Sequence, residues 1–315
     1  MRFRNRSRSQ TTSLLPTKPL RRSYIRILKI RILRILYYSR NNSPFISGDS
    51  IAELTDYYVF GRNSKRPLNK KRLQKSKSIS IPGHMFHLLV NDFAELPNLT
   101  TVVTCNSDQN FSSSCILPNN ITLWLCQNNA MSGDSRVHTL PIGIENIRLA
   151  RSGFPDLHRP QSNFEFQNRV LVPPMSPTNP VRVQVLEQLQ HNNRYFDIQA
   201  EYLTAKRYFK MTRNYRFILA LEGNGFENHR VWEALYQNSF PVMLRTKWSL
   251  SLAEFKFPIM YINSISDITG ESLETFQQSH RGFQSNHHEA LWTPYWKEII
   301  ESGVFREPNP GYQVY

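Results

Sequence analysis

The most informative stretch of the chain is YRFILALEGNGFENHRVWEALYQNSFPVML, residues 215–244. An apolar run at 215–221 leads into a loop with two glycines at 222–225, and an amphipathic segment at 228–237 follows. A short turn then precedes a second apolar run at 241–244. This order predicts a strand, a loop, a helix and another strand, which is the repeating unit of a parallel α/β sheet.

Three polar residues share one side of the predicted helix. At 100° per residue, His229, Arg230 and Glu233 fall within one third of the circumference, so they can face a cleft while the apolar side packs on the sheet. The loop glycines Gly223 and Gly225 let the backbone approach a ligand closely, and the helix amino end offers free N–H groups to a phosphate. Arg230 can bind that phosphate, and Glu233 can accept hydrogen bonds from a ribose diol. The alternative is a solvated helix with a His229–Glu233 contact.

The same alternation extends over the rest of the chain. Strands are predicted at the start of 44–60 and at 100–104, 137–142, 169–172 and 259–262, and helices at 51–57, 181–189, 273–276 and 289–300.

A polar, Pro-containing stretch at 151–168 divides this pattern into two. We therefore predict an α/β chain with two Rossmann-like parallel-sheet domains, at 44–166 and 167–315, after an extension at 1–43. Ligands of parallel sheets bind at the carboxyl ends of the strands, so the informative turns are those after Thr104, Ile142, Val172, Leu221 and Leu244.

The positive charge of the chain is concentrated in two places. The formal net charge is +15, yet residues 1–40 hold 12 basic residues and no acid, and residues 61–77 hold 8 more and no acid. The other 258 residues together carry −5. A nucleic-acid-binding domain spreads Lys and Arg over a folded face, so we expect no nucleic-acid partner for the body. An aromatic content of 12% and a hydrophobic content of 40% exclude a mainly disordered chain.

Residues 20–38 alternate apolar and basic residues. A cation follows every one to three apolar residues, which excludes a transmembrane helix and a secretory signal. We interpret residues 1–40 either as an anchor on an anionic membrane surface or as a poorly ordered extension. Three cysteines without a C-x-x-C pair favour free thiols in a reducing cytoplasm, so we expect a cytoplasmic protein that is peripheral to the membrane in the first interpretation.

The 215–244 stretch resembles the donor-binding segment of exostosin-like (GT47-type) glycosyltransferases. Their pattern runs Tyr-Lys-Phe, apolar strand, Pro-Arg-Gly-x-Gly, Asp-Thr/Ser-x-Arg, x-Trp/x-Glu-Ala-Leu, x-x-Gly-x-Ile-Pro-Val. Matching positions are Tyr215, Phe217, Gly223, Gly225, His229, Arg230, Trp232, Glu233, Ala234, Leu235, Pro241 and Val242. Residues 104–108 and 141–146 are similar to the Thr-His-Asn-Ser-Asp and Pro-Ile-Gly-x-Glu-Asn segments of a bacterial subgroup. The likeness extends over roughly residues 44–300.

The resemblance implies a GT-B fold, in which two Rossmann-like domains face a cleft. The C-terminal domain would hold a nucleotide sugar, and the N-terminal domain would present a glycan or lipid-linked acceptor for polysaccharide synthesis. The donor-binding residues would be Arg216, Glu222, Gly223, Asn224, Gly225, His229, Arg230 and Glu233, with Lys206 and Lys210 as further cations. No Asp-x-Asp occurs in the sequence, so the metal-binding diphosphate clamp of the other main glycosyltransferase fold is missing, and we expect no metal or cofactor.

Inverting transfer needs a base that takes the proton of the acceptor hydroxyl. We expect this base on the acceptor side, where Asp108 follows the strand at 100–104 and is the first candidate. Glu145 is the second candidate. The alternatives are an Asx-turn cap for Asp108 and a loop salt bridge for Glu145.

The sequence departs from the exostosin-like pattern at three points. Glu222 stands where these sequences often have Arg, Cys105 replaces a frequent His, and Asn238-Ser239 replaces a Gly-containing turn. A glutamate at this point of the motif resembles the Glu-Asn-Ser stretch of α1,3-fucosyltransferases, which also have the GT-B fold. The alternatives are therefore a fucosyltransferase-like enzyme and a catalytically inactive nucleotide- or glycan-binding module. A nucleic-acid-binding protein that acts through its basic tail is a further alternative.

Overall fold

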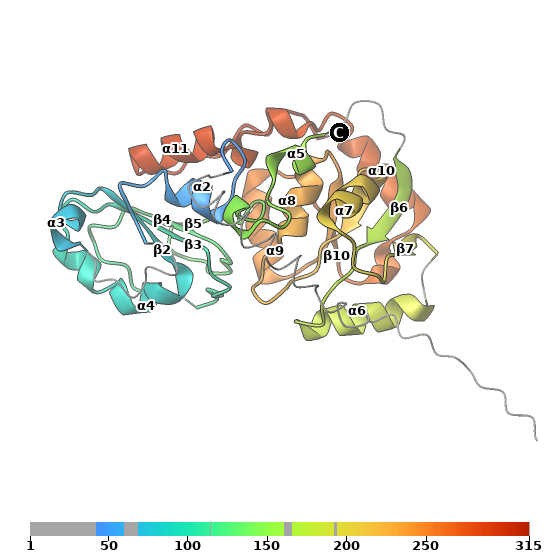
Figure 1. Cartoon of the computed structure of the whole chain (residues 1–315), viewed down its shortest axis with the longest axis horizontal. Coiled ribbons are helices and arrows are strands. Elements are labelled where there is room, and N and C mark those ends of the chain that lie inside the picture. The colour runs from blue at the N-terminus through green and yellow to red at the C-terminus, as the bar shows by residue number, and fades with distance from the viewer. Residues whose placement is uncertain (1–41, 60–68, 114, 161–165, 192–193, 315) are drawn as a thin grey trace, which may run out of the picture.

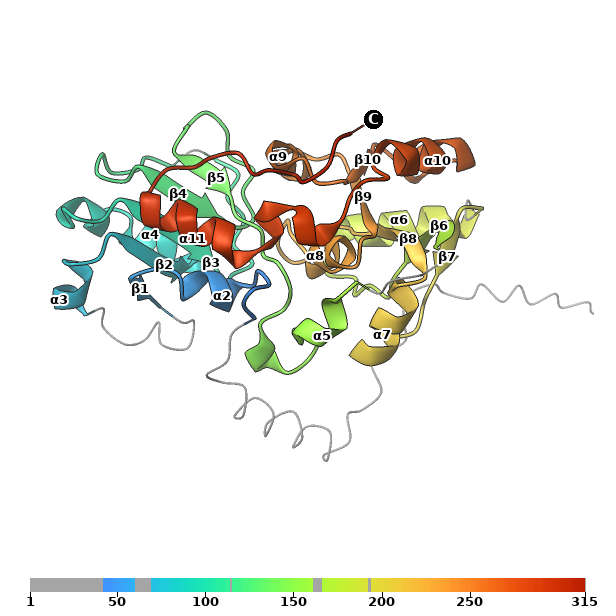
Figure 2. The same ribbon diagram turned by 90° about the horizontal axis from the view of Figure 1, so that it is seen from above.

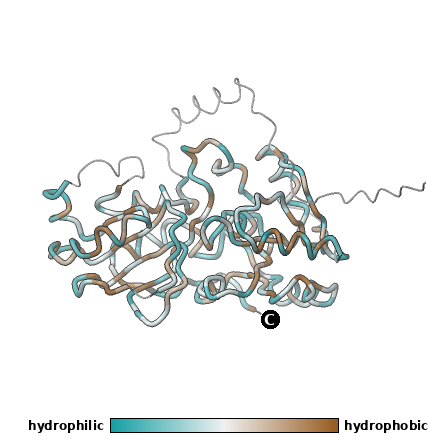
Figure 3. The backbone as a smooth tube through the Cα atoms, turned by 90° about the horizontal axis from the view of Figure 1, so that it is seen from below, coloured by the Kyte–Doolittle hydropathy of each residue, from teal (hydrophilic) through white to brown (hydrophobic). Residues whose placement is uncertain are grey.

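The computed structural model describes residues 42–59, 69–113, 115–160, 166–191 and 194–314. We call residues 42–160 the first unit and residues 166–314 the second unit. Each unit contains a five-stranded sheet whose paired strands are all parallel. Figure 1 shows the two units side by side, and Figure 3 shows hydrophobic segments in the interior of both. The prediction of an α/β chain with two parallel sheets is confirmed.

The strands of the first sheet lie in the order in which they occur in the sequence. They are β1 (Tyr57–Tyr58), β2 (Ser78–Pro82), β3 (Thr101–Cys105), β4 (Leu123–Cys126) and β5 (Val137–Thr139). The helices of this unit are α2 (Gly48–Ala52), α3 (Lys70–Leu73), α4 (Phe86–Leu89) and α5 (Pro155–His158). Crossovers between parallel strands are right-handed, so a sheet that always grows in one direction carries its connections on one face.

The two faces of the first sheet are covered in different ways. On one face, Phe86 of α4 stacks on Trp124 of β4, with ring centroids 3.9 Å apart. The other face is packed against α2 and α11 (Thr293–Ser302), the last helix of the chain. Val103 and Leu123 belong to the same buried core as Ile299 of α11. Figures 1 and 2 show α11 lying over the first sheet beside α2. A helix from the far end of the sequence thus covers the face that local connections leave open.

The strands of the second sheet lie in the order β7-β6-β8-β9-β10. They are β6 (Gln167–Val172), β7 (Phe196–Ile198), β8 (Tyr215–Leu219), β9 (Phe240–Leu244) and β10 (Met260–Ile262). The helices are α6 (Pro180–His191), α7 (Ala205–Thr212), α8 (His229–Tyr236), α9 (Lys247–Ser251) and α10 (Gly270–Ser279). The chain turns back after β7, so the direction of the strand order reverses between β6 and β8. Such a switch point opens a crevice at the carboxyl ends of the strands.

The local predictions failed at the start of the first unit. The prediction of a helix at 51–57 was wrong for most of its range: α2 begins at Gly48, because Ser47 and Ser50 form a capping box in the predicted turn, and it ends at Ala52, while Tyr57 begins β1. The strand expected just before it is absent from the described residues, where Phe45 forms a single bridge with Trp292. The strands β1, β2, β4 and β7 and the helices α3, α4, α5, α7 and α9 were not predicted from the sequence.

Some predictions concern residues outside the described ranges. The extension at 1–40 and the first part of the basic stretch, 61–68, lie outside them. Of the helices that the structure describes, none combines the length and the apolar character needed to cross a bilayer.

Candidate functional site

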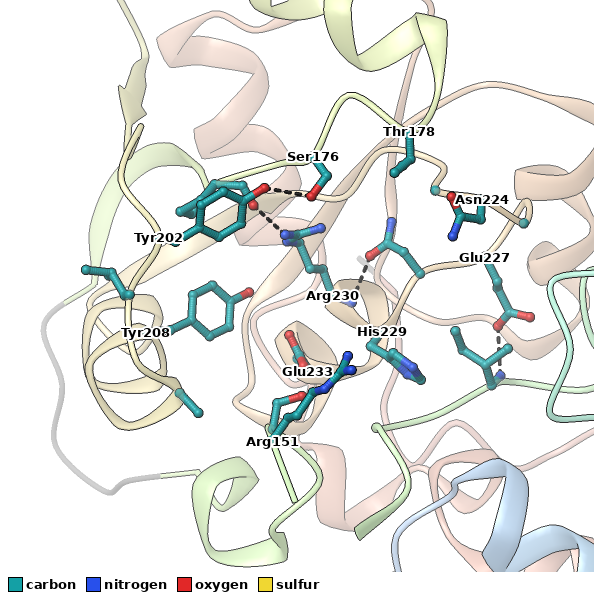
Figure 4. A pocket seen from close by; sticks show the side chains of 18 of the residues that line it. Arg151, Ser176, Thr178, Tyr202, Tyr208, Asn224, Glu227, His229, Arg230 and Glu233 are labelled. Carbon is teal, nitrogen blue, oxygen red and sulfur yellow. Dashed lines mark hydrogen bonds between the residues drawn. The ribbon is translucent and has the colours of Figure 1, made fainter. Parts of the chain in front are cut away.

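A cleft of about 760 Å³ lies between the two units. The first unit lines it with the turns after β3 and β5 and with residues 150–152, and the second unit lines it with the turns after β6 and β8 and with α7 and α8. The carboxyl edges of both sheets therefore face the same space. The volume is in the usual range for a small-molecule site. Figure 4 shows the lining side chains.

The turns after β6 and β8 meet at the switch point of the second sheet. Pro174, Ser176 and Thr178 come from the first turn, and Gly223, Asn224 and Gly225 come from the second. All six line the cleft. The prediction that the turns after Val172 and Leu221 carry the site agrees with this placement.

Helix α8 begins directly below this loop. Its N-cap is Asn228, whose Oδ1 accepts a hydrogen bond of 2.8 Å from the Arg230 amide. The Asn228 amide group also donates to the Leu221 carbonyl, which fixes the loop against the helix. Val231, Trp232, Ala234 and Leu235 of α8 are fully buried. His229, Arg230 and Glu233 line the cleft, as the helical periodicity predicts.

Glu233 is a buried residue at the base of the cleft and forms a hydrogen bond with Tyr208 of α7. Burial raises the pKa of Glu233, although the neighbouring His229 and Arg230 lower it. Burial also raises the pKa of the Tyr208 phenol, which therefore stays a donor at neutral pH. The Glu233 carboxylate is thus a fixed acceptor at the base of the cleft, shown with Tyr208 in Figure 4.

Arg182 lines the cleft, although sequence reasoning did not single it out. It lies in the first turn of α6 and is 5% exposed. Its Nε donates to the Glu222 carbonyl at 2.6 Å, and its Nη2 donates to the Leu221 carbonyl at 3.2 Å. Its Nη1 reaches the Ser176 carbonyl and the Thr178 hydroxyl, each at 3.2 Å. The Arg182 guanidinium therefore joins the turns after β6 and β8.

Glu227 also lines the cleft and was not predicted. Its carboxylate accepts hydrogen bonds from the Ile142 amide at 2.9 Å and the Asn128 amide at 3.3 Å, both in the first unit. It also accepts one from Trp232 Nε1 at 3.0 Å. Burial raises the pKa of Glu227 to about 7, against the lowering effect of these donors. This carboxylate holds the two units together at the floor of the cleft.

Further contacts join the two units around Glu227. His229 Nδ1 lies 2.8 Å from the Gly143 carbonyl, so this nitrogen carries the proton and Nε2 is left for other partners. The Phe226 amide donates to Asn110 Oδ1 at 2.8 Å, and the Glu227 amide donates to Asn128 Oδ1 at 2.8 Å. The loop before α8 is therefore shaped by the first unit as well as by its own sheet.

A side chain at either of the two loop glycines would meet atoms of the protein itself. A Cβ on Gly225 would lie 2.6 Å from Oδ1 of Asn128. A Cβ on Gly223 would lie 3.1 Å from Nη2 of Arg182. Gly225 therefore lets the units approach each other, and Gly223 leaves the Arg182 guanidinium uncovered on that side.

Arg216 and Glu222 are not among the residues that line the cleft. Arg216 lies at the amino end of β8, where its Nη1 donates to the Asn238 carbonyl at 3.1 Å and its guanidinium packs over Phe166. The strand runs away from that point, and at about 3.3 Å per residue Arg216 is too far from Gly223 to share a ligand with it. Glu222 forms a hydrogen bond with Thr246, and burial raises its pKa. Lys206 and Lys210 are exposed on α7 and do not line the cleft.

The two candidate bases lie in different environments. Asp108 is exposed in the cleft, and its Oδ2 accepts a hydrogen bond of 3.3 Å from the Asn224 side chain. Glu145 is buried outside the lining set, where its Oε2 accepts from the Ser152 amide at 2.9 Å and its Oε1 is 3.7 Å from Arg151. The loop salt bridge considered for Glu145 is therefore present.

The other departures from the exostosin-like pattern lie away from the cleft lining. Cys105 is buried in β3 against the Ser80 hydroxyl, and burial raises its pKa to about 12. Asn238 adopts a left-handed conformation with φ of 61°, which Asn tolerates almost as well as the Gly it replaces. In the part of the chain that the structure describes, no group of three or more His, Cys, Asp or Glu side chains is arranged to hold a metal ion.

No protein-family model matches the chain, and no curated protein matches it in a sequence search.

Proposed function

We propose that the protein is a glycosyltransferase of the GT-B type, which moves a sugar from a nucleotide-sugar donor to a glycan or lipid-linked acceptor. The observation that carries the proposal is the cleft in which the carboxyl edges of two parallel sheets face each other. A donor and an acceptor bound to opposite units would meet there. The exostosin-like pattern of residues 215–244 supports the same assignment, because its matching residues His229, Arg230 and Glu233 line this cleft.

The donor would bind on the second unit. The Arg230 side chain and the positive end of the α8 dipole would contact the diphosphate, and Glu233 would accept hydrogen bonds from the ribose hydroxyls. The guanidinium groups and the helix dipole would offset the charge that develops on the leaving diphosphate, without a metal ion.

The acceptor would bind on the first unit, where Asp108 is the general base. Asp108 takes the proton of the acceptor hydroxyl as its oxygen attacks the anomeric carbon. The bond between that carbon and the diphosphate oxygen breaks, and the nucleoside diphosphate leaves with the electron pair. Attack from the side opposite to the leaving group inverts the anomeric configuration.

A binding module without turnover is the second candidate function. It is favoured because both candidate bases are engaged by protein groups. Asp108 accepts a hydrogen bond from Asn224, and Glu145 is held by Ser152 and Arg151. A fucosyltransferase-like enzyme differs from the first proposal only in the donor, which would carry guanosine. Attachment of residues 1–40 to an anionic membrane at the cytoplasmic face is a separate part of the proposal.

The test begins with the thermal stability of the full chain in the presence of UDP, GDP, CDP and ADP. A preferred nucleotide raises the melting temperature by mass action. We expect Arg230→Ala and Glu233→Ala to weaken its binding about 10-fold or more, since each removes a charge-assisted hydrogen bond. Glu274→Gln, an exposed change on α10, is the control. Unchanged binding in both site variants would overturn the site assignment.

Turnover separates the two candidate functions. With the preferred donor, Asp108→Asn is expected to retain nucleotide binding and to lose transfer by about 100-fold or more. Binding of a nucleotide without turnover of its sugars in the unchanged protein would favour the binding module. Co-sedimentation with anionic vesicles, compared between the full chain and a chain lacking residues 1–40, tests the membrane part.

A further inference from the structure

The guanidinium of Arg182 is a buried charge whose hydrogen-bond partners are all neutral. They are the carbonyls of Ser176, Leu221 and Glu222 and the hydroxyl of Thr178. Four neutral oxygens orient the group but do not cancel its charge. A buried charge is costly unless an opposite charge compensates it.

Arg230 brings a second positive charge to the same place. Its Nη2 donates to the Pro174 carbonyl at 2.5 Å, while its buried Nε has no hydrogen-bond partner among the described residues. The two guanidinium groups are close enough to repel each other, since Arg230 and burial together lower the pKa of Arg182 to about 10, burial having the larger effect. In the described ranges, no carboxylate lies within 4 Å of either group. Arg230 lowers the pKa of Glu233, but burial has a larger effect on this carboxyl group and raises its pKa.

The two arginines are bound to the same short turn, the one after β6. Arg182 and Arg230 bind the carbonyls of Ser176 and Pro174, which are two residues apart and therefore at most about 7 Å from each other. Two guanidinium groups bound to carbonyls of one short turn can each contact a different phosphoryl group of a single diphosphate. Gly223 has no side chain that could cover Nη2 of Arg182, and both arginines line the cleft.

We infer that Arg182 and Arg230 form a diphosphate-binding site at the β6/β8 switch point, with one guanidinium for each phosphoryl group. The inference rests on the proposed function, which it deepens by naming Arg182 as the second cation in place of Arg216. The ligand chemistry is that of a diphosphate ester or of free pyrophosphate.

The probe is inorganic pyrophosphate, measured by calorimetry on the full chain with EDTA present, and inorganic phosphate is the comparison. We expect pyrophosphate to bind at least about 10-fold more tightly than phosphate, because only pyrophosphate can contact both arginines. Arg182→Gln and Arg230→Gln should each weaken pyrophosphate binding about 10-fold. Arg216→Gln is the matched control, a partly buried arginine at the opposite end of β8, and should change the affinity less than 2-fold.

A second pair of variants covers the case in which Arg182→Gln does not fold. Gly223→Ala places a methyl group 3.1 Å from Nη2 of Arg182 and should weaken pyrophosphate binding, while Gly282→Ala, whose nearest neighbour would be 3.7 Å away, should not. The basic residues 1–40 are the same in every variant, so their binding of pyrophosphate cancels in each comparison between variants. Equal affinities for phosphate and pyrophosphate, or an Arg182→Gln protein with full affinity, would overturn the inference.

The outcomes also separate this inference from the proposed function. If the protein binds pyrophosphate through Arg182 and Arg230 but transfers no sugar, the inference of a diphosphate site stands and the proposed glycosyltransferase function is contradicted. Full transfer activity in Arg182→Gln would support the proposed glycosyltransferase and contradict the role of Arg182 in binding the diphosphate. A nucleoside diphosphate that binds more tightly than pyrophosphate identifies a nucleotide as the source of the diphosphate.

Discussion

The two sheets have the same number of strands and the same parallel pairing, but they differ in strand order. The first sheet is wound in one direction, from β1 to β5, whereas the second reverses its direction between β6 and β8. Where the strand order reverses, the connections on either side of the reversal lie on opposite faces of the sheet. This opens a crevice at the carboxyl ends of the strands. The second unit therefore has a crevice from its own topology, whereas one face of the first sheet is covered by α2 and by α11 of the second unit.

The charges in the cleft follow this difference. The second unit contributes Arg182, Glu227, His229, Arg230 and Glu233 to the lining, and the first unit contributes Asp108 and Arg151. Beside the cleft, the first unit contacts the second through neutral groups, the side chains of Asn110 and Asn128 and the carbonyl of Gly143. We infer that the second unit binds the charged ligand and that the first unit closes over it.

The largest effect should come from the core that the first unit does not share with the second. Trp124 is fully buried, stacks on Phe86 and donates to the Thr104 hydroxyl at 3.0 Å, in a cluster made of first-unit residues. Trp124→Ala should lower the free energy of unfolding by about 3–5 kcal/mol. The folded fraction should keep its pyrophosphate affinity within about 2-fold, because the ligand groups are distant.

Chemical denaturation measures the first quantity and calorimetry the second. Leu88→Ala, at an exposed residue of α4, is the control and should stay within about 0.5 kcal/mol of the unchanged protein. A large loss of pyrophosphate affinity in folded Trp124→Ala protein would contradict the inference that the second unit alone binds the charged ligand.

Prediction from the sequence succeeded where the signal is local. The strands β3, β6, β8 and β9 are apolar or β-branched runs, and the polar side of α8 follows from helical periodicity. Arg182 could not be recognised, because its partners Leu221 and Glu222 are about 40 residues away and bind it through backbone carbonyls. The motif points to Arg216 as a donor-binding residue, but Arg216 lies at the amino end of β8, away from the cleft.

A pH-dependent effect should come from Glu227, the carboxylate between the units. Its pKa is about 7 in the folded protein, against an ordinary value of 4.5, because burial disfavours its charged form. Between about pH 4.5 and 7 the unfolded chain therefore binds fewer protons than the folded one at this residue. The stability contributed by Glu227 is full below pH 4.5, falls as the pH rises through this window, and is constant above it.

Denaturation at pH 5 and at pH 7.5 tests this sign by comparison with Glu227→Gln, which does not titrate. The stability of the unchanged protein minus that of the variant should fall by roughly 1–3 kcal/mol between the two values, since one pKa unit corresponds to about 1.4 kcal/mol. Other titrating groups are common to both proteins and cancel. A difference that is independent of pH would contradict the raised pKa.

The smallest of the three effects should come from Gly225, where the units touch. A methyl group there would meet Oδ1 of Asn128 at 2.6 Å, and Asn128 is held by the Glu227 amide and the Ser107 carbonyl. Gly225→Ala should cost about 1–2 kcal/mol through overpacking. Combining it with Asn128→Ala should cost less than the sum of the two single changes, as a double-mutant cycle would show. If the two changes lowered the free energy of unfolding additively, the added methyl group would not be in conflict with the Asn128 side chain.

The position of α11 also has a consequence for how the chain is made. A ribosome that adds about 5–20 residues per second releases Thr293 roughly 8–33 seconds after Cys126, the end of β4. Throughout that interval the face of the first sheet that carries Val103, Leu123 and Leu125 lacks the helix that shares its core. The nascent first unit therefore leaves apolar surface uncovered during synthesis, and it gains its full core only when nearly the whole chain has been made.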